Sequence, residues 1–169
     1  MKRSPDSTAQ MLALEALRSG TIASLAMIPF GLLFKSMGLR VGHYGPKVGE
    51  ALFGHQPDPW MPVLVQHFVI GWLSALPLLM FWLWRAPRAN RLGDGLLYGL
   101  AYYLAVNALA LPWLFGDAFP WQLGWSTIYP NLVVHLVFGV SIALTARMFG
   151  FRRFTYGLAK PAAPEFATK

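Results

Sequence analysis

The chain has 169 residues, of which 56% are hydrophobic and 12% are charged, with 14 Lys and Arg, 7 Asp and Glu and no Cys. Soluble domains carry about 25% charged residues, so the composition excludes a soluble enzyme and a disordered chain. The formal net charge of +7 then signals membrane topology rather than binding to nucleic acid. Without Cys, disulfides and thiolate metal ligands are excluded as well.

Four stretches of the chain lack charged residues: Ser19–Phe34, Pro59–Trp84, Gly95–Gly116 and Ala118–Ala146. A bilayer-spanning helix needs about 20 apolar residues. The sequence therefore predicts an all-α fold, a four-helix transmembrane bundle that forms one domain over residues 1–153. The predicted spans are residues 14–36, 61–84, 95–115 and 128–149, and residues 154–169 are expected to form a disordered cytoplasmic tail.

A long loop, residues 37–60, joins the first two spans. Pro46 is expected to start a short helix in it, with an apolar side that includes Val48 and Leu52, lying in the membrane interface. Asp94 is expected to cap the start of the third span.

The distribution of Lys and Arg predicts the orientation. Four spans place eleven of these residues on one side, and three, Lys35, Arg40 and Lys47, on the other. Both termini are therefore expected in the cytoplasm, with residues 37–60 outside.

The chain repeats itself at an offset of 68 residues. Leu64–Gly71 aligns with Leu132–Gly139, and the His and Gly positions stay in register. This pattern predicts two repeated α-hairpins related by an axis along the membrane normal. The second and fourth spans are then parallel.

Two histidines, His67 and His135, fall at matched depth in the outer half of the predicted spans. An ionisable residue inside a span is costly to bury and suggests a function. Asn107 lies at similar depth on the third span and is expected to bond one ring, and Gln66 precedes His67. These four residues form the predicted polar cluster.

Four glycines are expected to allow close packing. Gly71 lies one turn after His67, and Gly139 lies one turn after His135. Each glycine is expected to leave room beside the imidazole of its histidine. Gly95 and Gly99 form a GxxxG pair at the start of the third span, a pattern typical of helices that approach closely in membranes.

The histidines admit three interpretations. In the first, they are structural and form hydrogen bonds within the bundle. In the second, they hold haem b or another metal between the repeats. In the third, they relay protons in a proton-linked transporter. A copper or zinc site of His43, His55 and Asp58 in the loop is a further hypothesis. Because the spans contain no pair of carboxylates and no nucleophilic triad, we expect a non-enzymatic protein. A homo-oligomer or an accessory subunit of a larger membrane complex fits its small size.

One further set of features extends over residues 15–147: Gly20 and Ala23, Gly38–Gly54 with Tyr44, Val48-Gly49 and Gly54-His55, His67 with Gly71, Gly95 with Leu111-Pro112 and Gly116, and His135 with Phe138-Gly139. In these features the chain resembles the YagU-like and related families of small bacterial inner-membrane proteins. Where family members have an Arg-rich, Pro-rich stretch before the second span or a longer outer turn, this chain is shorter. The resemblance implies a multi-pass protein of the bacterial inner membrane and no particular activity.

Overall fold

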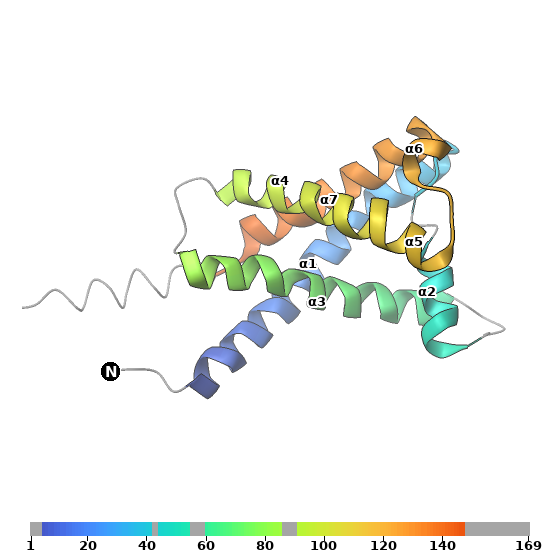
Figure 1. Ribbon diagram of the computed structural model, residues 1–169. Coiled ribbons are helices and arrows are strands. Elements are labelled where there is room, and N and C mark those ends of the chain that lie inside the picture. The colour runs from blue at the N-terminus through green and yellow to red at the C-terminus, as the bar shows by residue number, and fades with distance from the viewer. Residues whose placement is uncertain (1–4, 42–43, 55–59, 86–90, 148–169) are drawn as a thin grey trace, which may run out of the picture.

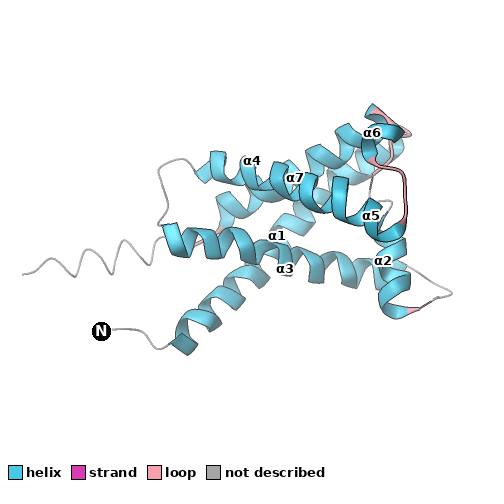
Figure 2. Ribbon diagram, viewed as in Figure 1, coloured by secondary structure: helices cyan, strands magenta, loops and turns pink. Residues whose placement is uncertain are grey.

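A computed structural model describes residues 5–41, 44–54, 60–85 and 91–147. Every regular element among these residues is a helix (Figure 2). Four helical stretches are long and apolar enough to cross a membrane: Thr8–Ser36, Val63–Trp84, Arg91–Phe115 and Trp125–Thr145. The prediction of an all-helical chain with four such stretches is confirmed. The predicted tail and the loop histidines His43 and His55 lie outside the described residues.

Three of these stretches belong to single helices, α1 (Pro5–Ser36), α3 (Trp60–Arg85) and α7 (Trp125–Thr145). The remaining stretch consists of α4 (Arg91–Tyr102), the π-helix η1 (Tyr103–Ala110) and α5 (Leu111–Phe115).

The π-helix was not predicted from the sequence. At its end the Leu111 N–H donates to the Val106 carbonyl, five residues back instead of four. Pro112 follows directly, and its ring and missing N–H disfavour a regular α-helical turn against Ala108. π-Helical turns are rare and occur often at functional sites.

Two short helices complete the structure, α2 (Tyr44–Phe53) and α6 (Pro120–Leu123). The sequence predicted that the first of them starts at Pro46. α2 begins two residues earlier, at Tyr44. It lies against α3, and α6 lies against α7.

The long helices run between the two ends of the bundle (Figure 1). The start of α1, the end of α3, the start of α4 and the end of α7 lie at one end of the bundle, which we call the terminal end. α2, α5 and α6 lie at the other, which we call the α2 end. α1 packs along both α3 and α7, and α4 packs along α7. The core between the helices includes Ala23, Leu79, Trp82 and Ile142, whereas many Leu side chains are exposed, which suits a lipid environment.

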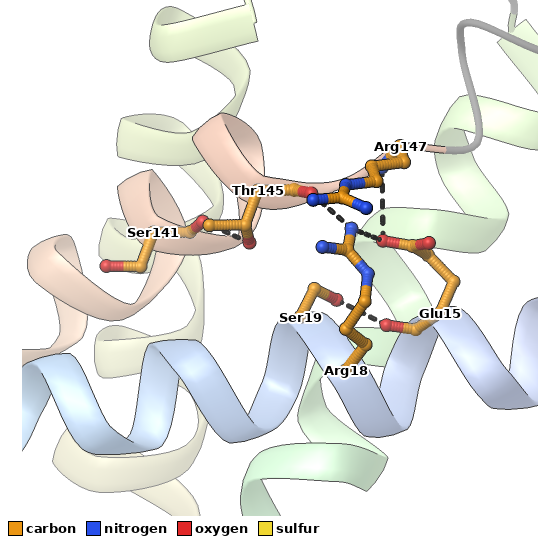
Figure 3. A network of polar contacts seen from close by, with 6 residues as sticks. All are labelled: Glu15, Arg18, Ser19, Ser141, Thr145 and Arg147. Carbon is orange, nitrogen blue, oxygen red and sulfur yellow. Dashed lines mark hydrogen bonds and ion pairs between the residues drawn. The ribbon is translucent and has the colours of Figure 1, made fainter.

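A polar network fastens α1 to α7 at the terminal end (Figure 3). The Arg18 guanidinium donates both to the Glu15 carboxylate and to the Thr145 carbonyl. The same Glu15 Oε1 accepts the Arg147 backbone N–H at 3.1 Å. Because the last carbonyls of a helix have no partner within it, Arg18 satisfies one of them and complements the helix dipole.

Asp94 does not act as a helix cap, contrary to our expectation. α4 begins at Arg91, so Asp94 already lies inside its first turn. Its Oδ2 accepts a hydrogen bond from Trp82 Nε1 of α3 at 2.9 Å. The carboxylate thus joins α3 to α4 at the terminal end.

Candidate functional site

A cavity of about 600 Å³ lies in the half of the bundle that carries α2. Its walls come from α1, α3, α7 and the stretch formed by α4, η1 and α5, and α2 lies at its outer end. Most of the lining is apolar. The polar side chains on the lining are Ser24, Tyr44, Gln66, His67, Ser74, Tyr102, Asn107 and His135. All four residues of the predicted polar cluster therefore face one space.

Glycines explain which helices approach closely around this cavity. A Cβ at Gly20 of α1 would stand 2.8 Å from the Gly71 carbonyl oxygen of α3. On the other side of the bundle, a Cβ at Gly139 of α7 would stand 2.1 Å from the Gly95 carbonyl oxygen of α4. A Cβ at Gly99 would meet the His135 carbonyl oxygen at 2.4 Å. Backbones therefore touch at both crossings, as in other membrane helix pairs with small residues.

These contacts correct the expectation that the glycines leave room beside the imidazoles. Beside Gly139 the space is filled by α4. Beside Gly71 it holds the Ser24 hydroxyl, which would stand 2.0 Å from an added Cβ, although Gly71 also lines the cavity.

α3 and α4 are joined by side chains rather than by touching backbones. Ser74 Oγ of α3 donates to the Tyr102 hydroxyl of α4 at 2.7 Å, and the Tyr98 hydroxyl donates to the Ser74 carbonyl. Ser74 and Tyr102 also line the cavity, so their hydrogen bond lies at its edge.

His67 lies on α3, next to α1. Its Nε2 is 3.2 Å from the Ser24 carbonyl oxygen. A carbonyl only accepts, so Nε2 carries the proton and donates. In the neutral ring, Nδ1 then keeps its lone pair.

His135 lies on α7 and is buried. Its Nδ1 is 2.6 Å from the Asn131 carbonyl oxygen, so here Nδ1 donates and Nε2 keeps the lone pair in the neutral ring. Tyr102 and Tyr103 stand beside the imidazole, with ring centroids 5.4 and 5.8 Å away. Both histidines are thus held by backbone carbonyls of their surroundings, and Asn107 bonds neither ring, contrary to our expectation.

Three residues of the lining each carry a polar atom that is packed among protein atoms and has no hydrogen-bond partner there: Ser24 Oγ, Gln66 Oε1 and Asn107 Oδ1. Ser24 is 1% exposed and Gln66 is 5% exposed. Burial of such an atom without a partner costs about 1–3 kcal/mol. Most buried polar groups in proteins are satisfied, so three around one cavity call for an explanation.

α2 forms the outer wall of the cavity through Tyr44, Gly45 and Val48. The Tyr44 ring stacks on Phe115 of α5, with centroids 6.1 Å apart. Lys47 Nζ pairs with the Asp117 carboxylate, 2.6 Å from Oδ1. Burial, and to a lesser degree the negative charge of Asp117, raises the pKa of the Tyr44 phenol. Tyr44 therefore remains a neutral phenol at physiological pH.

Sequence reasoning missed several lining residues, including Ser24, Ser74 and Tyr102. Tyr98 and Tyr102 stand four residues apart and so share one helix face, which is a signal that the sequence offers. The two serines carry no comparable signal, because serine is common in membrane helices as a packing residue. Within the described ranges, no three His, Asp or Glu side chains gather as a metal site.

Comparisons of the chain with protein-family models, with curated proteins and with solved structures found no match. The resemblance to the YagU-like families stays a prediction from the sequence.

Proposed function

We propose that this is a non-enzymatic, multi-pass protein of the bacterial inner membrane that binds a small molecule in the cavity enclosed by α1, α3, η1 and α7. The observation that carries the proposal is the cavity itself, whose mainly apolar lining includes the four residues Gln66, His67, Asn107 and His135. The cavity volume of about 600 Å³ lies within the range of ligand pockets, ~300–1,000 Å³. An apolar space with a few converging polar groups is the usual form of such pockets.

The experiment is identification of bound small molecules by mass spectrometry after purification from native membranes into nanodiscs. Val106 lines the cavity, and Val106→Trp should fill it and abolish the bound species. Leu104, two residues away on η1, is 48% exposed, so Leu104→Trp is the matched control and should retain it. Recovery of no small molecule with the wild type, or equal recovery with Val106→Trp, would contradict the proposal.

The proposed orientation has both termini in the cytoplasm and the α2 end outside. It is supported by the division of Lys and Arg, eleven against three, between the two sides. Reporter fusions at Lys169 and within α2 should label opposite sides of the membrane. Labelling of Lys169 from outside would reverse the assignment.

A second candidate function is binding of haem b between His67 and His135. It is favoured by the ring nitrogens, since each histidine donates one N–H to a backbone carbonyl and so keeps a lone pair on the other nitrogen. Histidines that ligate metals are commonly held in this way. An absorption spectrum of the protein from native membranes tests it: a Soret band that disappears in both His67→Ala and His135→Ala would support haem, and a colourless protein would reject it.

We also propose that the chain arose by duplication of a two-helix unit. The proposal is supported by the 68-residue offset and by the glycine contacts, because Gly71 and Gly139 each touch a helix that precedes them in the chain. An experimental structure should superpose residues 11–85 on 94–153 by a rotation of about 180° about the membrane normal. A different relation between α3 and α7 would refute the duplication.

A further inference from the structure

The lining of the cavity offers a bound molecule mainly hydrocarbon surface. Residues of α1, α3, η1 and α5 contribute to this surface, so it comes from several sides of the cavity. Six apolar residues both line the cavity and are partly exposed: Met27, Ile28, Val63, Ile70, Val106 and Leu111. Because they are not fully buried, these side chains keep surface that another molecule can touch.

Polar and charged groups contribute little to the surface within reach. Ser24 Oγ, Gln66 Oε1 and Asn107 Oδ1 are packed among protein atoms, so a molecule in the cavity does not touch them. Among the described residues of the lining there is no Asp, Glu, Lys or Arg. A bound ion would therefore lack a partner of opposite charge, and its burial in an apolar space would be costly. Water would find few hydrogen-bond partners there as well.

The cavity is long in the direction of α3. Its lining on this helix runs from Trp60 to Ser74, a distance of about 21 Å at ~1.5 Å per residue. The hydrocarbon of one leaflet is about 15 Å deep, which is half of the core of a bilayer. A lipid chain of one leaflet can therefore extend along the cavity, whereas a compact molecule would leave part of it empty.

Part of the lining lies on the outside of the bundle, where the proposed position in the membrane places lipid. Leu64 lines the cavity, is 38% exposed and lies within Val63–Trp84, the apolar stretch of α3. Trp60 at the start of α3 also lines the cavity and is 57% exposed, and Trp is typical of the membrane interface. A chain can therefore enter from the bilayer without passing through water, with its head group at the α2 end.

From this surface we infer that the cavity holds one acyl chain of a phospholipid from the leaflet at the α2 end. This inference rests on the proposed function, because it names the molecule that occupies the same cavity. Lipid chains are as apolar as Leu, so transfer of a chain from the bilayer into the cavity has no hydrophobic driving force. The chain is held by packing instead, because it supplies the dispersion contacts that an unfilled apolar lining lacks.

The test is photo-crosslinking in liposomes with a phospholipid that carries a diazirine near the end of one acyl chain. After illumination, the labelled residues are identified by tandem mass spectrometry. Ile70 lines the cavity about 15 Å from Trp60 along α3, a depth that the end of a chain reaches. Leu73, one turn further on, is 61% exposed and is not part of the lining, so surrounding lipid should label it in any case. We expect adducts at both residues.

Two variants show whether the adducts at Ile70 depend on the cavity. Val106→Trp should lower them by about tenfold or more, because the indole takes the space of the chain. The adducts at Leu73 should stay unchanged and so report that the variant is folded and inserted. Leu104→Trp is the matched control, since Leu104 is 48% exposed and outside the lining, and it should leave the adducts at both positions unchanged.

The outcomes separate this inference from the proposed function. Adducts at Leu73 but none at Ile70 in the wild type would overturn the inference. Adducts at Ile70 that persist in Val106→Trp would place the chain outside the cavity and overturn it as well. In either case the proposed function stands if the purified protein retains another molecule that Val106→Trp loses, and it fails together with the inference if no such molecule is recovered.

Discussion

The backbone contact between α4 and α7 makes Gly139→Ala a strong test of the fold. A Cβ at this position would stand 2.1 Å from the Gly95 carbonyl oxygen and 2.9 Å from the Gly99 nitrogen. Both neighbours are backbone atoms, which cannot rotate away as a side chain can. To reach even a tight contact of 3.0 Å, α4 would have to move by about 0.9 Å.

The expected loss follows from this movement. A gap of 0.5–1 Å removes roughly a quarter to a half of the dispersion energy of each contact it opens. Overpacking of a tight interface typically costs about 1–3 kcal/mol. We therefore expect Gly139→Ala to lower the free energy of unfolding by about 2–3 kcal/mol.

Reversible unfolding in mixed micelles of mild detergent and SDS, followed by circular dichroism, measures this quantity. Gly31→Ala in α1 is the matched control, because a Cβ at Gly31 would have no atom within 4 Å. That control should leave the stability unchanged or raise it by up to ~1 kcal/mol, since Ala favours the helix. Equal stability of the two variants would refute the close contact of α4 with α7.

Three further predictions use the same unfolding assay. Gly71→Ala should lower the free energy of unfolding by ~1–2 kcal/mol because its Cβ would stand 2.0 Å from Ser24 Oγ. Adding Ser24→Ala to the same chain should restore most of the loss, since the Ser24 Cβ would stand at 3.4 Å. Strictly additive effects of the two substitutions on stability would contradict this contact. Glu15→Ala should cost ~1–3 kcal/mol because it removes the carboxylate partner of Arg18 and the acceptor of the Arg147 N–H, and leaves Arg18 with the Thr145 carbonyl alone. A neutral effect would count against the network. Lys47→Ala and Asp117→Ala should each lower the free energy of unfolding by at most ~1 kcal/mol, because the ion pair is partly exposed. The interaction energy between the two substitutions should disappear at high salt. An interaction energy that persists at high salt would contradict this account.

The sequence alone predicted four apolar helices long enough to cross a membrane, and the four residues of the predicted polar cluster line one cavity in the structure. Charge-free stretches of sufficient length identify membrane helices because the cost of placing charge in lipid is a property of each segment by itself. The same cost made His67 and His135 noticeable, since few polar residues occur within such stretches. Asn107 was chosen by its depth alone, and the structure does place it on the same cavity.

The hydrogen bonds of these residues were not predictable from the sequence. The Ser24 and Asn131 carbonyls that hold the two rings belong to the backbone, which every residue carries, so they leave no signal in the sequence. Asn107 was expected to bond a ring because it lies at a similar depth on the third span. The π-helix that carries it departs from the regular 3.6-residue period on which span prediction depends.

Composition and charge pattern determined that this chain is helical and suited to a bilayer, because transfer into lipid is decided segment by segment. The tertiary structure alone decided which helices touch and which stay apart. Between helices in lipid there is no hydrophobic driving force, so contact depends on the detailed fit of surfaces, here Gly20 on Gly71 and Gly95 on Gly139. α3 and α4 meet instead through the side chains of Tyr98 and Tyr102, which bond to Ser74, and Ser74 and Tyr102 also line the cavity.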